Sequence, residues 1–86
     1  MSDAYVKGKV IIVVKPGVDH ADIEKILEEH SHIDNYQVPT EKEGILSRLY
    51  ALSVPEGAEA EVVKDLINKY ASLMDKVYQP PIRRLS

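Results

Sequence analysis

Apolar residues form two kinds of pattern along this chain, continuous runs and stripes at helical spacing. An unbroken run from Val10 to Val14 ends in the turn Lys15-Pro16-Gly17, and a second apolar segment, Leu49 to Val54, ends in the similar turn Pro55-Glu56-Gly57. Runs of this length are typical of strands, and proline beside glycine is typical of turns. A segment with the period of an amphipathic helix follows each turn. The pattern therefore predicts one unit of strand, turn and helix that is used twice.

Two helices are predicted. The first begins at Asp19, a residue type favoured at helix N-caps, and carries acids near its start, where the helix dipole favours them. Its expected buried stripe is Ile23, Ile26, Leu27 and His30. The second helix runs from about Ala58 to Leu73, and its expected buried stripe is Val62, Val63, Leu66, Ile67 and Tyr70. Each helix has a single stripe, so both are expected to cover the same side of a sheet.

Two further strands complete the pattern. One is expected from Ile33 to Val38 and is followed by a polar loop, residues 39–44. A short last strand is expected from Lys76 to Gln79, and Pro80 and Pro81 end it because neither can donate a ladder hydrogen bond. The order β-α-β-β-α-β defines the ferredoxin-like split βαβ sandwich, an α+β fold. We therefore expect a four-stranded antiparallel sheet with two helices on one face.

The two faces of the sheet differ in the residues that they carry. In the third strand, Leu46, Tyr50, Leu52 and Val54 are expected on one face, and Leu49 and Ala51 on the other. The first strand consists of consecutive β-branched residues, so both of its faces require cover. Either Ile11 and Val13, or Val10, Ile12 and Val14, must line the face without helices. A binding partner covers these residues, or long side chains of adjacent strands do; both explanations stay open.

Composition limits the class of protein. The 86 residues, 44% of them hydrophobic, fit a single domain, residues 1–86. A net charge of -3, with Arg83-Arg84 as the one basic cluster, argues against nucleic acid as a partner. Without cysteine the fold has no disulfide. Neither a signal-peptide pattern nor a membrane-spanning run is visible, so we expect a soluble, cytoplasmic protein with no membrane partner.

The sequence offers little catalytic chemistry. Its glycines stand singly and form no phosphate-binding loop, and its serines have no supporting arrangement of histidine and acid. His30, His32 and Asp34 are spaced so that they could bind zinc, although solvated residues at a helix end show the same pattern. We therefore expect a protein that is not an enzyme and that uses no cofactor and no metal.

A tail, residues 80–86, follows the last strand directly. Two prolines stiffen its exit toward polyproline geometry, which lowers the entropy that is lost when such a segment docks. The tail is thus a candidate binding element, and a frayed terminus is the alternative.

Three segments of the chain resemble a known protein family. The segment Val10 to Val18, with the acidic helix after it, resembles the opening of the subtilisin propeptide-like inhibitors, a family of protease prodomains and free-standing inhibitors. The segment Leu49 to Gly57 is similar to the family's third strand and turn, and Val77 to Pro80 lies where the family carries an apolar pair, Glu and often Pro. The resemblance implies an inhibitor of a subtilisin-like serine protease. The start at Met1 favours a stand-alone inhibitor over a cleaved prodomain that acts as a folding chaperone.

The resemblance also implies the residues that bind. In the family the open sheet face packs on surface helices of the protease, while the C-terminal tail lies in the substrate cleft as an added strand. The implied protease-binding tail is Ile82, Arg83, Arg84, Leu85 and Ser86. The implied docking surface is Tyr78, Gln79, Leu49 and Ala51. Gln79 departs from the acid that is usual there, so it can still accept amide hydrogen bonds but lacks the attraction of a charge for a helix dipole.

A second resemblance leads to a different class of protein. The first strand and its Lys15-Pro16-Gly17 turn also resemble the ferredoxin-like domain attached to some deoxy-heptulosonate-phosphate synthases. This resemblance implies a regulatory or oligomerisation domain that self-associates through its sheet as a homodimer and binds a small effector. The tail would then be a linker remnant. A dimer in solution favours this class, and a monomer favours the inhibitor.

Overall fold

Strands and helices follow one another in the predicted order. The computed structural model describes residues 5–81, in which the order is β1 (Lys9–Val14), α1 (His20–Glu29), β2 (Asn35–Gln37), β3 (Leu49–Ser53), α2 (Glu59–Tyr70) and β4 (Met74–Tyr78). Short 3-10 helices, η1 (Ile45–Arg48) and η2 (Ala71–Leu73), precede β3 and β4. The prediction of two strand-turn-helix units is confirmed.

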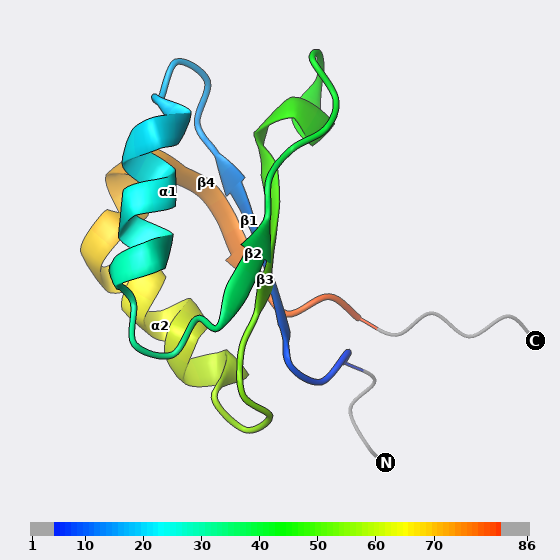
Figure 1. Cartoon of the computed structure of the whole chain (residues 1–86), viewed down its shortest axis with the longest axis vertical. Coiled ribbons are helices and arrows are strands. Elements are labelled where there is room, and N and C mark those ends of the chain that lie inside the picture. The colour runs from blue at the N-terminus through cyan, green and yellow to red at the C-terminus, as the bar shows by residue number, and fades with distance from the viewer. Residues whose placement is uncertain (1–4, 82–86) are drawn as a thin grey trace, which may run out of the picture.

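The strands form one antiparallel sheet with the order β2-β3-β1-β4. β1 lies in the centre between β3 and β4, so β2 and β4 are the edge strands. Both helices lie on the same side of this sheet, and within residues 5–81 no helix covers the opposite side (Figure 1). This is the predicted α+β, ferredoxin-like arrangement, with one face of the sheet left open.

The hydrophobic core lies between the sheet and the two helices. It contains Val10, Ile12 and Val14 of β1, Tyr50 and Leu52 of β3, Ile23 and Leu27 of α1, Val62 and Leu66 of α2, and Met74 of β4. The predicted alternation in β3 is confirmed, because Tyr50 and Leu52 are fully buried against the helices while Leu49 and Ala51 lie on the opposite face. In β1, Val10, Ile12 and Val14 face the core, which places Ile11 and Val13 on the open face.

The two helices begin in different ways. Asp19 is the N-cap of α1, as predicted, and its carboxylate accepts a hydrogen bond of 2.9 Å from the backbone N–H of Ala21. At α2, the buried carboxylate of Glu59 accepts hydrogen bonds from the N–H of Gly8 at 2.6 Å and from the N–H of Gly57 at 2.8 Å. Glu59 thereby ties the start of α2 to the turn that precedes β1.

Two predicted core positions are wrong. Ile67 of α2 is 46% exposed, because the helix turns this residue past the edge of the sheet toward the outer side of β4. Leu46 is 54% exposed, because it belongs to η1, where the two-residue alternation of a strand does not apply. The strand boundaries also shift: β2 begins at Asn35 and β4 begins at Met74.

Candidate functional site: the open sheet face

The open face is built from side chains that stand in register across the strands. In one row, Gln37 of β2 pairs with Ala51 of β3, Ala51 pairs with Ile11 of β1, and Ile11 pairs with Tyr78 of β4. In the next row, Leu49 pairs with Val13, which pairs with Lys76. We call the apolar and aromatic members Ile11, Val13, Leu49, Ala51 and Tyr78 the open-face cluster. Three of them, Leu49, Ala51 and Tyr78, belong to the docking surface that the resemblance to the inhibitor family implies.

The burial of this cluster decides between the two explanations for the apolar first strand. Val13 is only 2% exposed although it lies on the face without helices, so its neighbours on β3 and β4 shield it. Ile11, Leu49 and Ala51 are half-buried, and Tyr78 is 38% exposed. Shielding by adjacent side chains therefore accounts for Val13, and the rest of the cluster is left accessible to a partner.

A groove runs along the β2 and β3 half of the open face. It has a volume of about 680 Å³ and is lined by Tyr36, Gln37, Val38, Pro39, Thr40, Glu41, Leu46, Leu49 and Ala51. Val38 and Leu46 form its rim and are about half exposed, at 47% and 54%. Sequence reasoning missed these rim residues, because it treated residues 39–44 as a polar connection and Leu46 as core. The signal that could have identified them is the pair of aliphatic residues, Ile45 and Leu46, directly after a run of charged ones.

Polar contacts fix the borders of the face. Lys9 donates a hydrogen bond of 3.1 Å from Nζ to Oγ of Ser53, within the row below Ala51. At the opposite end, Nη1 of Arg48 donates to the carbonyl of Val14 at 2.7 Å and to a carboxylate oxygen of Asp75 at 2.9 Å. Arg48 thus joins the start of β3 to both β1 and β4.

Tyr36 holds the edge strand β2 against α1. Its hydroxyl donates a hydrogen bond of 2.7 Å to Oε2 of Glu28. That hydrogen bond, and then partial burial, raise the pKa of Tyr36 to about 12. Burial also raises the pKa of Tyr50, on the helix side of β3, to about 12. Both hydroxyls therefore stay neutral at any physiological pH, and Tyr36 fixes one wall of the groove.

Gln79 lies apart from the other predicted docking residues. It borders a separate hollow with Tyr5, Lys7, Glu56, Gly57 and Glu59, at the end of the sheet near the start of α2. Tyr78, one residue earlier, lies on the open face beside Ile11. The structure therefore brings Leu49, Ala51 and Tyr78 together through Ile11 and places Gln79 elsewhere.

Pro80 and Pro81, which follow β4, are held to the N-terminal segment. Tyr5 forms a bridge with Pro81, and the N–H of Val6 donates a hydrogen bond of 2.9 Å to the carbonyl of Pro80. The predicted tail residues Ile82, Arg83, Arg84, Leu85 and Ser86 lie outside the described residues.

The histidines near the end of α1 make contacts to α2. Nε2 of His30 lies 3.5 Å from a carboxylate oxygen of Asp65, and the His30 side chain is 9% exposed. Nε2 of His32 lies 3.6 Å from a carboxylate oxygen of Glu61. His30 is therefore buried, as the helical stripe predicts, and the alternative of a solvated residue at the helix end is wrong for His30 but agrees with His32, whose side chain is 43% exposed. In the described part of the chain, no group of three or more potential ligands is arranged to hold a metal ion.

Comparison with known proteins does not indicate a function, so the function is argued from this geometry. Comparisons of the chain with protein-family models, with curated proteins and with solved structures give no match. None of the helices between residues 5 and 81 is long and apolar enough to span a membrane.

Proposed function

We propose that the protein inhibits a subtilisin-like serine protease by docking its open sheet face on the enzyme while residues 82–86 occupy the substrate cleft. The observation that carries this proposal is the accessible row formed by Ala51, Ile11 and Tyr78 on a face without helices. An apolar centre surrounded by polar residues is the usual composition of a protein-binding surface.

The connectivity supports the same arrangement. Tyr78 is both a member of the open-face cluster and the last residue of β4, so three residues separate it from Ile82, the first residue of the implied protease-binding tail. A partner that covers the open face at Tyr78 therefore lies close to the point where the tail begins. Inhibition by this route needs occupancy of the cleft and no chemistry from the inhibitor.

The proposal is tested by measuring inhibition constants against a subtilisin. We compare the whole chain with a chain that ends at Pro81 and with the Ala51→Asp variant, which places a charge at the centre of the face. Ala60→Asp is the matched control, because Ala60 is exposed on α2 on the opposite side of the sheet. We expect nanomolar to low-micromolar inhibition that the truncation and Ala51→Asp weaken at least tenfold, about 1.4 kcal/mol, and that Ala60→Asp leaves unchanged.

Absence of inhibition by the folded chain would refute the proposal. The groove beside Leu49 and Ala51 then favours the alternative of a regulatory domain, because its volume of about 680 Å³ falls in the range of small-molecule sites. Binding of small effectors is measured in that case by chemical-shift changes at these two residues.

A further inference from the structure

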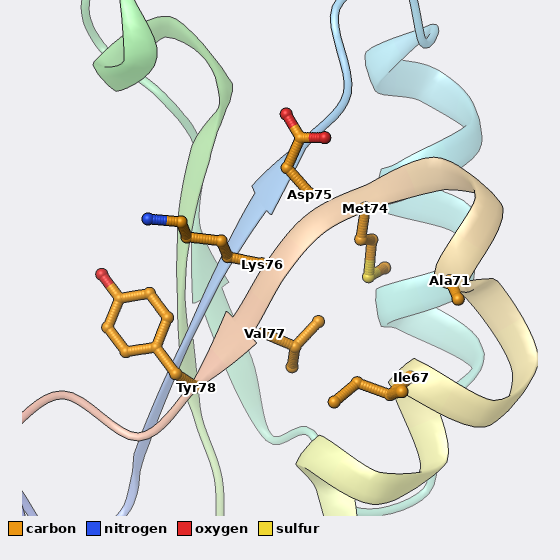
Figure 2. A pocket seen from close by; sticks show the side chains of 7 residues that line it. All are labelled: Ile67, Ala71, Met74, Asp75, Lys76, Val77 and Tyr78. Atoms are coloured by element: carbon orange, nitrogen blue, oxygen red, sulfur yellow. The ribbon is translucent and has the colours of Figure 1, made fainter.

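The outer edge of β4 is the second accessible surface of the sheet. β4 has five residues, whereas the opposite edge strand β2 has three. Beside it runs a groove of about 630 Å³, which is lined by Ile67, Ala71, Met74, Asp75, Lys76, Val77 and Tyr78. Figure 2 shows Met74, Val77 and Ile67 on the helix side of this strand, with Lys76 and Tyr78 on the other side. An edge strand with apolar side chains next to it is a template for pairing with another strand.

A bulge in β4 restricts which strand can pair there. Val13 pairs with Lys76 and Val14 pairs with Met74, so Asp75 is an extra residue in β4. The carbonyls of Leu73 and Pro80 accept hydrogen bonds from the β1 side. Since backbone groups of a strand alternate in direction, Val77 directs its N–H and its carbonyl outward, and Met74 directs its carbonyl outward while its N–H donates to the carbonyl of Ala71, so the outward carbonyls are three residues apart. A regular strand has a spacing of two and cannot match both positions.

A second copy of β4 matches this edge in spacing, charge and shape. When two copies run antiparallel, Met74 of one lies opposite Val77 of the other, so both outward positions meet with the same spacing of three residues. The same alignment places Asp75 of one copy opposite Lys76 of the other, twice, so that opposite charges meet. Asp75 also forms an ion pair of 2.9 Å with Arg48 of its own chain. Any alignment that places Lys76 opposite its own copy sets like charges against each other.

The helices of the two copies also fit this arrangement. α2 packs over both β4 and β1. A helix centred between these two strands would lie about half a strand spacing, roughly 2.4 Å, inside β4, and with about 4.8 Å between the paired β4 strands the two α2 axes would then be about 10 Å apart, a normal distance for packed helices. Ile67, which is 46% exposed, and Ala71 then lie between the helices. This explains the apolar residue that the helix leaves exposed.

We propose that the protein forms a symmetric homodimer by antiparallel pairing of β4 with β4 of a second copy, sealed by the helix contact at Ile67. The dimer has a continuous eight-stranded sheet, and it leaves the open-face cluster uncovered. It is independent of the proposed inhibitor function and differs from a dimer that forms through the sheet face.

The first test is sedimentation velocity from about 1 µM to about 1 mM protein, a range that covers weak and moderate dimers. We compare the unaltered chain with Ile67→Lys and with Leu46→Lys, which introduces lysine at another exposed aliphatic residue, one that lines the groove along β2 and β3. We expect a dimer that Ile67→Lys weakens at least tenfold and Leu46→Lys does not change. A monomer at every concentration refutes the proposal. A dimer that only Leu46→Lys weakens also refutes it and indicates association through the open face.

Charge reversal tests the alignment itself. Lys76→Asp gives a strand with two acids at the central pair, and Asp75→Lys gives one with two lysines, so neither variant is expected to dimerise alone. An equimolar mixture restores opposite charges and is expected to form the heterodimer. Asp75→Lys also removes the partner of Arg48, so far-ultraviolet circular dichroism must show that it is folded. If the folded variants dimerise separately as well as the unaltered chain does, the proposed alignment is wrong.

Discussion

Replacing Glu59 by Gln tests how the first strand is anchored to the second helix. Glu59 is 6% exposed, and its carboxylate accepts two backbone hydrogen bonds, from Gly8 and from Gly57. The hydrogen bond from Gly8 contributes most to lowering the pKa of Glu59, and together the backbone hydrogen bonds outweigh the opposing effect of burial. The folded state therefore favours the ionised form of Glu59.

The expected loss follows from these two contacts. A hydrogen bond to a charged group contributes about 1.5 to 3 kcal/mol, and a neutral one about 0.5 to 1.5 kcal/mol. Gln keeps one oxygen that can accept a hydrogen bond, but it is neutral, and its side-chain NH2 group would face the other backbone N–H, donor against donor. We therefore expect Glu59→Gln to lower the free energy of unfolding by about 2 to 4 kcal/mol. Domains of this size have unfolding free energies of roughly 4 to 13 kcal/mol, so the loss is a large fraction of the total.

The pH dependence has a definite sign. Because the pKa of Glu59 is lowered in the folded state, its contribution is fully present above the ordinary value of 4.5 and is lost as pH falls through the lower, folded-state pKa. We expect the difference between the unaltered chain and Glu59→Gln to be constant near neutral pH and to narrow in acid.

Urea unfolding followed by circular dichroism measures both effects. Glu56→Gln is the matched control, because Glu56 is an exposed acid near the same helix end. It separates the loss of charge near the helix dipole from the loss of the buried hydrogen bonds. A loss for Glu59→Gln no larger than for the control, or a difference that acid leaves unchanged, would refute the reasoning.

The remaining predictions concern other contacts that hold the sheet. Gly8→Ala should cost about 1 to 3 kcal/mol of unfolding free energy and more than Gly17→Ala, because both residues have positive φ but only at Gly8 does an added Cβ meet an atom, the Val54 carbonyl at 3.1 Å. Arg48→Ala should cost more than Asp75→Asn in chemical denaturation, because the second change leaves the hydrogen bond of Arg48 to Val14 intact, and a partly exposed ion pair contributes only about 0 to 1 kcal/mol. Tyr36→Phe should remove one tyrosinate absorbance step at about pH 12. Since the pKa of Tyr36 is raised, the contribution of its hydroxyl to the free energy of unfolding is present below the ordinary value of 10.0 and is lost as pH rises through about 12. If the step that disappears lies near the ordinary value of 10.0 instead, the hydrogen bond to Glu28 is not formed.

The sequence was sufficient for the fold because its strongest signals are local. The β-branched run of β1, the Pro-Gly turns and the Asp19 cap each act within a few residues, and each lies where it was expected. The alternation of Leu49 to Leu52 likewise placed Leu49 and Ala51, two of the residues proposed for docking, on the open face. Local pattern and final topology agree wherever neighbouring residues alone determine the conformation.

The rest depended on contacts between distant segments. In the sequence, Glu59 is an ordinary acid in a first helical turn. Its buried hydrogen bond depends on the position of Gly8, which lies 51 residues away in the chain. Ile67 fits the helical stripe, but the width of the sheet decides that it lies beyond the edge. The bulge at Asp75 arises from the pairing of β4 with β1 and has no signature in β4 alone. Such features require the tertiary register, which sequence periodicity does not supply.

The two proposed surfaces share Lys76 and Tyr78 of β4, but only Lys76 meets a charge of the second copy, and this limits how strongly the surfaces can influence each other. Lys76 lies in the same row as Val13 and Leu49 on the open face, and in the dimer it opposes Asp75 of the second copy. Dimerisation would therefore neutralise one charge at the border of the docking face without covering the apolar centre. An exposed charge pair contributes about 0 to 1 kcal/mol, a factor of at most about five in an equilibrium constant. Because coupling between two binding equilibria is reciprocal, protease binding should alter the dimer constant by the same factor through this charge. Inhibition constants measured at monomeric and at dimeric concentrations should thus differ by no more than about fivefold, and a larger difference would mean that the dimer covers part of the open face.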